Sequence, residues 1–333
     1  MPADVAMTSA ELCAGGGGAA LGLERAGFSH VLLAEIDPDA CTTLQANRPG
    51  WKVDQGDIRQ LDGRQLDGVD LLSGGVPCQP FSVGGWQLGE ADPRDLFPEA
   101  LRLIAVARPR AILLENVPGL LASKFAAYRQ LITARLEALA YAWDWRILQA
   151  SDYGVPQLRP RAVLVAAAPA VMARFRWPAR LAVQSSVGEV LGASMASRGW
   201  EGAAAWAAAA TGIAPTLAGG SRLHGGPDLG PTRAKREWRG RLGVNGFGLA
   251  GQVPGPGEFD RPPTPAELHQ GTAGMPKLTV AQAALLQGFP GDWVFSGGKT
   301  AAWRQVGNAF PPPVAEAVGR SIVAALKEAE HGG

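Results

Sequence analysis

The first thirty residues constrain the fold most, because they read as a strand, a glycine turn and a helix in immediate succession. A weakly apolar run at about 5–12 predicts a strand, four consecutive glycines stand at 15–18, and residues 19–26 have helical composition with Gly27 as the C-cap. This order is typical of an α/β unit that binds a nucleotide, since glycines let a ligand approach the backbone and the helix start offers free N–H groups. A glycine turn can also serve packing alone.

The composition restricts the class of protein. The 333 residues suffice for one large domain and a smaller one, and the formal net charge of +1 means that any polyanion site must be local. The sequence shows neither a signal peptide nor an apolar tract long enough to span a bilayer, so we expect a soluble cytoplasmic protein without a membrane partner. Dispersed histidines and three scattered cysteines argue against a zinc site and a disulfide framework, and we expect no metal. The cysteines are Cys13, Cys41 and Cys78.

Acidic residues follow the next predicted strands. The apolar run 31–34 ends in Glu35, and a carboxylate at this place can accept hydrogen bonds from ribose hydroxyls. Asp57 follows a short turn that could place it near an adenine amino group. An acid in this region can instead cap a helix, as Asp37 before Pro38 would. Together with the glycine turn, these residues predict a pocket for an adenosyl group, and the absence of a P-loop lysine motif means that no triphosphate is required.

A cysteine follows the strand predicted at 69–72. Cys78 is fixed between Pro77 and Gln79 just past the strand end, where an α/β protein places a reacting group. Free cysteine also occurs as a small buried apolar residue, so the residue alone leaves both interpretations open. The glycine-bounded stretch 83–90 is either a loop that closes over a substrate or an ordinary surface loop.

Further charged residues are expected near the same edge of the sheet. The strand predicted at 111–114 ends in Glu115, which brings a carboxylate to the edge where Cys78 is expected. Arg159 and Arg161 stand at alternate positions entering a later strand, so they are expected to point the same way. They could bind a carboxylate or phosphate, or lie on a solvated edge.

The character of the chain changes between about 180 and 277, where regular periodicity fades. Six basic residues stand against two acidic ones in the stretch 222–241. This excess marks a candidate face for a polyanion, and the alternative is a solvated charged helix. Order returns with a capped helix at 278–290 and a last helix from 313 to about 327. We expect one domain at 1–180, completed by 305–333, and an irregular second domain at 181–304.

The motifs, taken in order, resemble those of the DNA cytosine-5 methyltransferases of bacterial restriction–modification systems. The resemblance covers nearly the whole chain except about 180–275, where the family places its variable target-recognition region. It implies an α/β, Rossmann-like sheet dependent on S-adenosylmethionine, with a smaller irregular target-recognition domain at 181–304. It rests on the glycine turn after Leu12, Pro77-Cys78-Gln79, Glu115-Asn116-Val117, Gln157-x-Arg159-x-Arg161, the Leu278–Pro290 helix and Gly307-Asn308.

The resemblance implies the reaction. Cys78 would attack C6 of a cytosine flipped out of double-stranded DNA, and C5 would take the methyl group from S-adenosylmethionine, leaving S-adenosylhomocysteine. A protonated Glu115 donating to N3 would neutralise the charge that enters the ring. Arg161, with Arg159 nearby, would hold the base carbonyl and the adduct. No side chain identifies itself as the base that takes the C5 proton.

The resemblance also implies binding residues, with one departure. The family has an aromatic residue where Cys13 stands, so Ile36 or another apolar residue would contact the adenine, and Cys13 would be structural. The residues implied in cofactor binding are Cys13, Ala14, Gly15, Gly17, Gly18, Glu35, Ile36, Asp57, Ile58, Pro77 and Asn308. Those implied in DNA binding are Gln79, Ser82, Gly84, Arg94, Arg233, Arg236 and Arg239.

Three other functions compete with this one. The family's tRNA-directed branch has a Cys-Phe-Thr signature in its target region, but no cysteine follows Cys78 here. A non-catalytic DNA-binding relative would not need Cys78, Glu115 and Arg161 intact. A thiol hydrolase would require a paired histidine, and none follows Cys78 before His224. We therefore expect a monomeric enzyme that acts on double-stranded DNA, with any cognate restriction endonuclease acting separately.

Overall fold

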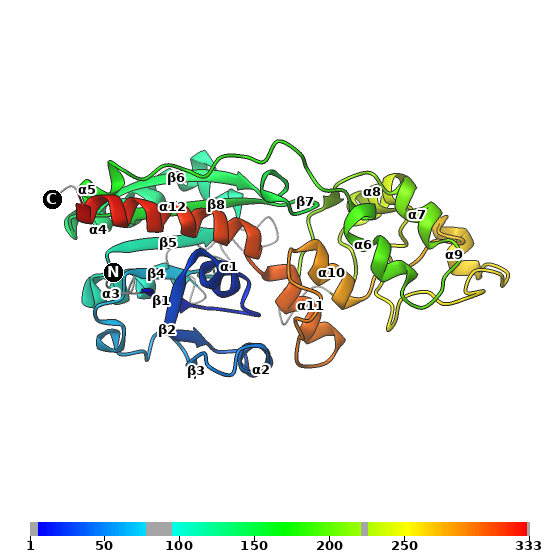
Figure 1. The fold of residues 1–333 in the computed structure, drawn as a ribbon, viewed down its shortest axis with the longest axis horizontal. Helices are drawn as coiled ribbons and strands as arrows, with labels where there is room; N and C mark the ends of the chain where they lie inside the picture. The colour runs from blue at the N-terminus through cyan, green and yellow to red at the C-terminus, as the bar shows by residue number, and fades with distance from the viewer. Residues whose placement is uncertain (1–5, 78–94, 221–225, 332–333) are drawn as a thin grey trace. The chain divides into compact units, whose positions relative to one another are not determined.

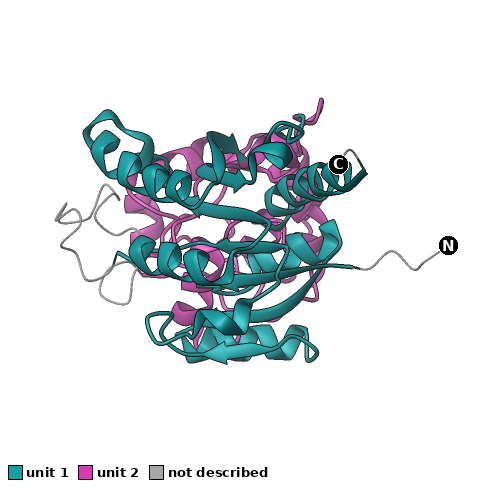
Figure 2. Cartoon of the chain, turned by 90° about the vertical axis from the view of Figure 1, so that its left-hand side faces the viewer, with its two compact units in different colours: residues 1–149, 160–179, 312–333 teal, residues 150–159, 180–311 magenta. Residues whose placement is uncertain are grey.

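The computed structural model describes residues 6–77, 95–220 and 226–331. The chain divides into two compact units, which Figure 2 colours separately. Unit 1 comprises residues 1–149, 160–179 and 312–333, and unit 2 comprises residues 150–159 and 180–311. The division predicted from the sequence assigned residues 150–159 and 305–311 to the first domain. In the structure both segments belong to unit 2.

Unit 1 is built on a seven-stranded sheet. Its strands are β1 (Met7–Leu12), β2 (Phe28–Glu35), β3 (Val53–Gln55), β4 (Leu71–Gly74), β5 (Ala111–Asn116), β6 (Ala142–Gln149) and β8 (Pro160–Ala167). Their order is β3-β2-β1-β4-β5-β8-β6 (Figure 1). The first five pair in parallel, whereas β8 runs antiparallel to β5 and β6. Because β3 and β4 lie on opposite sides of β1, a topological switch point lies between β1 and β4, where α/β sheets bind ligands.

Helices cover both faces of the sheet. They are α1 (Gly18–Ala26), α2 (Pro38–Asn47), α3 (Phe97–Ala107), α4 (Ala126–Ala138), α5 (Pro169–Met172) and α12 (Pro312–His331), with 3₁₀ turns η1 (Gly63–Leu66), η4 (Pro118–Leu121) and η5 (Ser123–Phe125). Leu72 of β4 belongs to a buried cluster with Leu103 of α3, whereas Leu33 of β2 packs with Ala20 of α1. Leu72 pairs with Ala10, and Leu33 pairs with Glu11. Ala10 and Glu11 are consecutive in β1, so the two leucines project from opposite faces of the sheet. The apolar strand residues therefore build two core layers.

The glycine turn adopts the backbone conformation that its residues predict. Gly15 and Gly17 have φ of 54° and 86°, and Gly27 caps the C-terminus of α1 with φ of 103°. Side chains rarely adopt this left-handed region, so glycine is needed at these places. The predicted strand, glycine turn, helix and C-cap are confirmed.

Helices α1 and α12 cross at very short range, although they lie almost three hundred residues apart in the chain (Figure 1). A Cβ added to Gly22 would lie 2.4 Å from Pro312 O and 2.6 Å from Ala315 Cβ. A Cβ added to Gly319 would lie 2.8 Å from Ala26 Cβ. The absence of side chains at these two glycines therefore permits the crossing.

Unit 2 consists mainly of short helices and connecting loops. Its elements are η6 (Ala150–Tyr153), β7 (Gln157–Leu158), α6 (Val187–Ala196), α7 (Ala203–Ala209), β9 (Ala214–Pro215), α8 (Thr232–Leu242), α9 (Pro265–Gln270), α10 (Val280–Leu286) and α11 (Lys299–Asn308). The helix predicted at 278–290 is α10, with a capping box between Thr279 and Gln282. Strands β7 and β9 form a short parallel pair. The region therefore contains helices that its weak periodicity did not predict.

Replacing Gly22 by alanine should destabilise the protein by about 1–3 kcal/mol, because backbone atoms of α12 would have to move away from the new methyl group. The matched control is Gly240→Ala in α8, where an added Cβ has no atom within 4 Å. That change should instead stabilise by about 0.5–1 kcal/mol through helix propensity. Urea unfolding of the full chain measures both, and equal effects would contradict the crossing described here.

Candidate active site

One edge of the sheet in unit 1 gathers polar side chains from successive strands. Parallel strands end at the same edge, and β8, being antiparallel, begins there. In the order of the strands the edge carries Asp57 after β3, Glu35 on β2, Glu11 on β1, Glu115 on β5 and Arg161 on β8. Neighbouring strands lie about 4.8 Å apart, so the edge from β3 to β5 is about 19 Å long.

The register places the three glutamates on one face of the sheet. On one side Glu11 pairs with Leu33, which stands two residues before Glu35. On the other side Glu11 pairs with Ser73 of β4. Ser73 in turn pairs with Leu113, which stands two residues before Glu115. Paired residues on neighbouring strands project from the same face, as do residues two apart on one strand. This is the face on which Leu33 packs against α1.

Glu35 is held in place by backbone donors from the glycine turn and from the two residues that follow β2. Its Oε2 accepts a hydrogen bond from Gly15 N at 2.7 Å, and its Oε1 accepts from Ile36 N at 2.9 Å and Asp37 N at 2.8 Å. Burial raises the pKa of Glu35, although these hydrogen bonds oppose the change. A carboxylate offers about four acceptor positions, so one remains for a ligand hydroxyl.

The neighbouring positions offer an apolar surface and a second carboxylate. Ile36 is 62% exposed, so its apolar side chain is accessible to a ligand. Asp57 accepts hydrogen bonds from Arg59 N at 3.0 Å and Arg59 Nη1 at 2.9 Å, and the backbone hydrogen bond is the first cause that lowers its pKa. Ile58 is buried in the core, so only its main chain can reach a ligand.

These residues fit an adenosyl ligand. A Cβ added to Gly15 would meet no atom within 4 Å, so the space beside this residue is open. Glu35 and Asp57 provide acceptors for hydroxyl and amino groups, and Ile36 provides an apolar contact. The structure therefore brings together the sequence-predicted acceptors at the ends of β2 and β3.

Cys13 and Cys41 are not suited to act as nucleophiles. Cys13 has a left-handed backbone, with φ of 56°, and burial together with the nearby Glu35 and Glu11 raises the pKa of its thiol. Burial raises the pKa of Cys41 to about 11, and its Sγ donates to Glu35 O at 3.4 Å. Both sulfurs therefore remain thiols near neutral pH, and the thiolate is the reactive form.

Glu115 and Arg161 form an ion pair across the antiparallel β5–β8 pair. Arg161 Nε lies 2.6 Å from Glu115 Oε1, and the two side chains are 11% and 12% exposed. Arg161 Nη1 donates to Pro160 O at 2.8 Å. Burial lowers the pKa of Arg161, against the opposite effect of Glu115. A Cβ added to Gly75 would lie 3.4 Å from Glu115 Oε2, so the segment after β4 runs close to this carboxylate.

Asn116 fixes the chain that leads to Pro77, a role that sequence reasoning missed. Its Nδ2 donates to Val76 O at 3.0 Å, and its Oδ1 accepts from Val117 N at 2.8 Å. Its place beside Glu115 in the motif was the available signal. Pro77 itself is exposed, and the sequence-predicted residues Cys78, Gln79, Ser82, Gly84 and Arg94 lie outside the described residues.

Arg159 is not a strand partner of Arg161. It precedes β8, belongs to unit 2 and is fully buried. Its guanidinium donates to Leu217 O at 2.5 Å, Gly307 O at 2.7 Å and Ala309 O at 2.9 Å. The expectation that the two arginines share one strand face is not met, because alternation begins only where β8 begins, at Pro160.

Gln157 and Asn308 join the same part of unit 2. Gln157 Oε1 accepts from Leu217 N at 2.8 Å, and its Nε2 donates to Gln287 Oε1 at 2.7 Å. Asn308 Nδ2 donates to Gly220 O at 3.1 Å. These side chains tie the segments around Leu217 and Gln287 together, so the Gln-x-Arg motif has a structural use that its spacing does not reveal.

The three sequence-predicted arginines of α8 differ in environment. The side chain of Arg233 is 88% exposed, with Nε 3.5 Å from Glu237 Oε1, and Arg236 is exposed as well. Arg239 is half-buried and its Nη1 donates to Gln270 O at 2.7 Å, which attaches α8 to the end of α9. Only Arg233 and Arg236 of these three present their charge to solvent.

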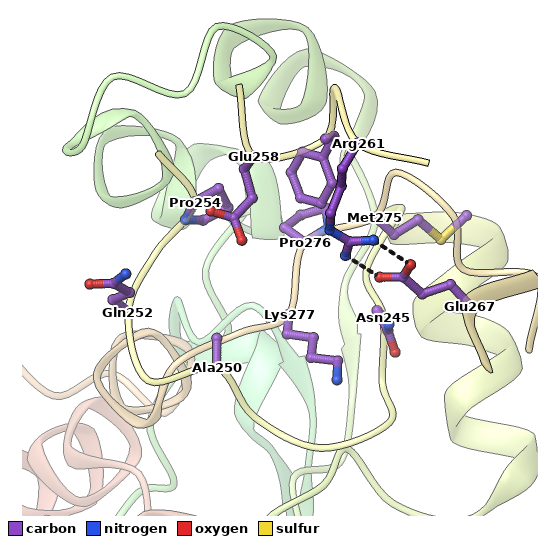
Figure 3. A pocket seen from close by; sticks show the side chains of 11 residues that line it. Asn245, Ala250, Gln252, Pro254, Glu258, Arg261, Glu267, Met275, Pro276 and Lys277 are labelled. Carbon is purple, nitrogen blue, oxygen red and sulfur yellow. Dashed lines mark hydrogen bonds and ion pairs between the residues drawn. The ribbon is translucent and has the colours of Figure 1, made fainter. Parts of the chain in front are cut away.

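Unit 2 also contains a pocket of about 230 Å³, which no predicted site residue lines (Figure 3). Arg261 and Glu267 form an ion pair at its rim, with Nη2 2.7 Å from Oε1. This hydrogen bond is the first cause that lowers the pKa of Glu267, to about 2. Lys277, Gln252 and Asn245 add polar groups to the lining, which suits a ligand that forms hydrogen bonds.

In the part of the chain that the structure describes, no three His, Cys, Asp or Glu side chains are grouped so that they could hold a metal ion. No helix in these residues is both long and apolar enough to cross a membrane.

The order of motifs, the sheet and the polar edge belong to one class of protein. The profile of C-5 cytosine-specific DNA methylases matches residues 7–324. The chain therefore belongs to the C-5 cytosine-specific DNA methylase family, which confirms the predicted family and enzyme class. The fold resembles solved structures of methyltransferases over nearly its full length, which confirms the predicted Rossmann-like methyltransferase fold.

Particular relatives are similar over most of the chain. Type II methyltransferase M.NaeI of Lentzea aerocolonigenes is 52% identical over 320 residues, which cover 95% of this chain and 74% of that protein. Type II methyltransferase M.NgoMIV of Neisseria gonorrhoeae is 48% identical over 330 residues, or 96% and 98% of the two chains. Among solved structures, a DNA modification methyltransferase encoded within an E. coli prophage gives a TM-score of 0.65 at 22% identity over 96% and 99% of the two chains. A variant of DNMT2 from Spodoptera frugiperda gives 0.67 at 16% identity over 95% and 99%.

Replacing Arg159 by methionine should lower the free energy of unfolding by about 3–5 kcal/mol, because three buried carbonyls would lose a charged donor. Arg233→Met, at an exposed position, should change it by less than about 0.5 kcal/mol. Urea unfolding of both full-length variants measures the difference. An Arg159→Met protein with normal stability but no methyl transfer would instead support a direct role in the reaction.

Proposed function

We propose that this protein transfers a methyl group to C5 of a cytosine that is flipped out of a specific short sequence in double-stranded DNA, through a covalent bond between Cys78 and C6. The observation that carries the proposal is the order of groups along the sheet edge. Acceptors for an adenosyl ligand lie after β3 and at the end of β2, the described chain that leads to Cys78 follows β4, and the Glu115–Arg161 pair lies on β5 and β8, next in the sheet.

The methyl donor we propose is S-adenosylmethionine, which supplies an activated methyl group when bound. Glu35 would accept from one ribose hydroxyl, Asp57 would accept from the adenine amino group, and Ile36 would contact the ring. The open space over Gly15 and the three backbone hydrogen bonds that orient Glu35 support these roles.

Glu115 and Arg161 would bind the cytosine together. The ion pair requires a carboxylate, whereas donation to N3 requires a carboxylic acid, so Glu115 must take up a proton as the base enters. Arg161 uses Nε for Glu115 and Nη1 for Pro160 O, which leaves Nη2 for the O2 carbonyl of cytosine. Donors preorganised in this way are worth roughly 10²–10³ in rate.

The proposed covalent steps balance as follows. The Cys78 thiol would lose its proton to solvent, an S–C6 bond would form, and the π electrons of the C5–C6 double bond would shift through C4 to N3, where Glu115 donates its proton. C5 would then bond to the methyl group as the bond between that methyl group and the donor's sulfur breaks, which leaves S-adenosylhomocysteine, and N3 would return its proton to Glu115. Loss of the C5 proton to water or another base would re-form the C5–C6 double bond while the S–C6 bond breaks and the thiolate leaves. The raised pKa values of Cys13 and Cys41 support Cys78 as the nucleophile by exclusion.

We further propose that unit 2 recognises the DNA and that the protein works as a monomer in the bacterial cytoplasm. The exposed Arg233 and Arg236 of α8 would contact phosphates or base edges. The naming of both M.NaeI and M.NgoMIV as type II methyltransferases supports a role beside a separate restriction endonuclease. Bisulfite sequencing of a plasmid from cells that express the protein would identify the methylated sequence.

The covalent step can be trapped without knowing the recognised sequence. Long DNA copied with 5-fluoro-deoxycytidine triphosphate contains every candidate site, and fluorine at C5 cannot leave as a proton does. Wild-type protein with S-adenosylmethionine should form a stable conjugate that mass spectrometry maps to Cys78, and Cys78→Ser should form none. A conjugate at another side chain, or none at all, would contradict the mechanism.

The same protein with tritiated S-adenosylmethionine separates the competing functions. Label should enter duplex DNA and not RNA, and Cys78→Ser should transfer none while still binding DNA. Label in RNA alone would favour an RNA methyltransferase. Absence of label from both would favour a binding protein or a thiol hydrolase.

Arg236→Ala should weaken DNA binding and lower the slope of log affinity against log salt concentration by about 1, because one phosphate contact is lost. Arg239→Ala should mainly lower thermal stability, since its guanidinium holds Gln270 O. Fluorescence anisotropy at several salt concentrations and a thermal melt measure the two effects. If Arg236→Ala changes neither the affinity nor the slope, α8 is only a solvated face.

A further inference from the structure

Glu11 is a buried carboxyl group that none of the proposed steps uses. It is 2% exposed on β1, and its Oε2 has no hydrogen-bond partner among the described residues. A buried acceptor without a partner is costly, and an ionised one is more so. An acid at such a place in the central strand therefore requires an explanation other than packing.

The charged groups around Glu11 repel a negative charge. Glu35 of β2 and Glu115 of β5 project from the same face of the sheet, and burial, together with these two carboxylates, raises the pKa of Glu11 to about 8. The other titratable neighbours are Cys13, a thiol after the same strand, and His30 on β2, whose pKa burial lowers.

The cation that the register places on this face, Arg161 of β8, is paired with Glu115 at 2.6 Å, and no ion pair joins it to Glu11 among the described residues. Strand β4 contributes Ser73 beside Glu11, and α1 has its only charged residues, Glu24 and Arg25, at its far end. His30 is engaged by Ser9 Oγ and Ala20 O at 2.8 and 2.9 Å. Glu11 is therefore held neutral near pH 7 until a positive charge arrives.

The strand order shows which part of a ligand would bring that charge. If Asp57 at β3 binds the adenine and Glu35 at β2 binds the ribose, then β1 follows, just before the Cys78 segment after β4. The part of S-adenosylmethionine beyond its ribose carries the sulfonium, and the product S-adenosylhomocysteine has an uncharged thioether there. Both molecules keep the same amino and carboxyl groups, so the sulfonium is the difference in charge between them.

We propose that Glu11 determines the preference for the methyl donor over its product, by releasing a proton to solvent when the sulfonium binds and taking one up when the neutral thioether remains. This inference rests on the proposed function, since it assumes that S-adenosylmethionine occupies the edge. Glu11 is then a specificity-determining residue rather than a reacting one.

Isothermal titration calorimetry of the full-length protein tests this without any turnover. Titrations in buffers of different ionisation enthalpy should show that S-adenosylmethionine releases more protons than S-adenosylhomocysteine does at pH 7. Between pH 6 and 7.5, the ratio of the two dissociation constants should shift about tenfold toward the donor, since a linked proton gives at most about tenfold per pH unit.

Two variants complete the test. Glu11→Gln should lower donor affinity at least about tenfold, change product affinity by less than about threefold, and abolish the pH dependence of the ratio. Glu35→Gln, as the control, should weaken both ligands equally, because both carry the ribose. Equal proton release for the two ligands in wild type overturns the role of Glu11 even if the variant fails to fold. Failure of wild type to bind either ligand would instead contradict the proposed function.

Discussion

The parallel pairing of β1 with both β2 and β4 is the constraint on which the candidate site depends. Parallel pairing makes the strands end at one edge, and the reversal of strand order at β1 opens the space between the glycine turn and the segment after β4. Residues from five separate parts of the sequence meet there only because of this topology. Gly15 and Gly17, which have left-handed backbones, then keep the turn before the N-terminus of α1 free of side chains.

Electrostatics divides this edge into two parts. On the β2–β1 side, Glu11, Cys13 and Glu35 are raised in pKa chiefly by burial, and Arg59, which pairs with Asp57, opposes the change only weakly at Cys13. On the β5–β8 side, Arg161 compensates Glu115 directly. The first part suits a cationic ligand, and the second suits a neutral base with one donor and one acceptor on its edge. Under the proposed function, the methyl donor would therefore bind to one part of the edge and the methyl acceptor to the other.

The sequence predicts the parts of this arrangement that depend on local chemistry. Glycine at left-handed positions, the capping box of α10 and acids at strand ends follow from short-range rules, and the structure contains them. The contacts of Arg159 and Arg239 do not follow from these rules, because their partners are backbone carbonyls of distant segments. Every residue has a backbone carbonyl, so the sequence does not indicate which one an arginine binds. Strand alternation also fails for Arg159, since it depends on where β8 begins. The role of Glu11 does not follow from the sequence, because a single acid within an apolar strand does not indicate whether its carboxyl group is buried or which groups surround it.

The crossing of α1 and α12 has a consequence for how the protein is made. The helix that begins at the glycine turn packs against the final helix of the chain, and Gly22 fits only against Pro312 and Ala315. A ribosome must therefore synthesise the whole of unit 2 before the first helix can acquire its neighbour. Nascent chains that stop short of residue 312 would expose the side of α1 that α12 covers. We therefore expect chaperones or proteases to bind such incomplete chains, so that they do not accumulate.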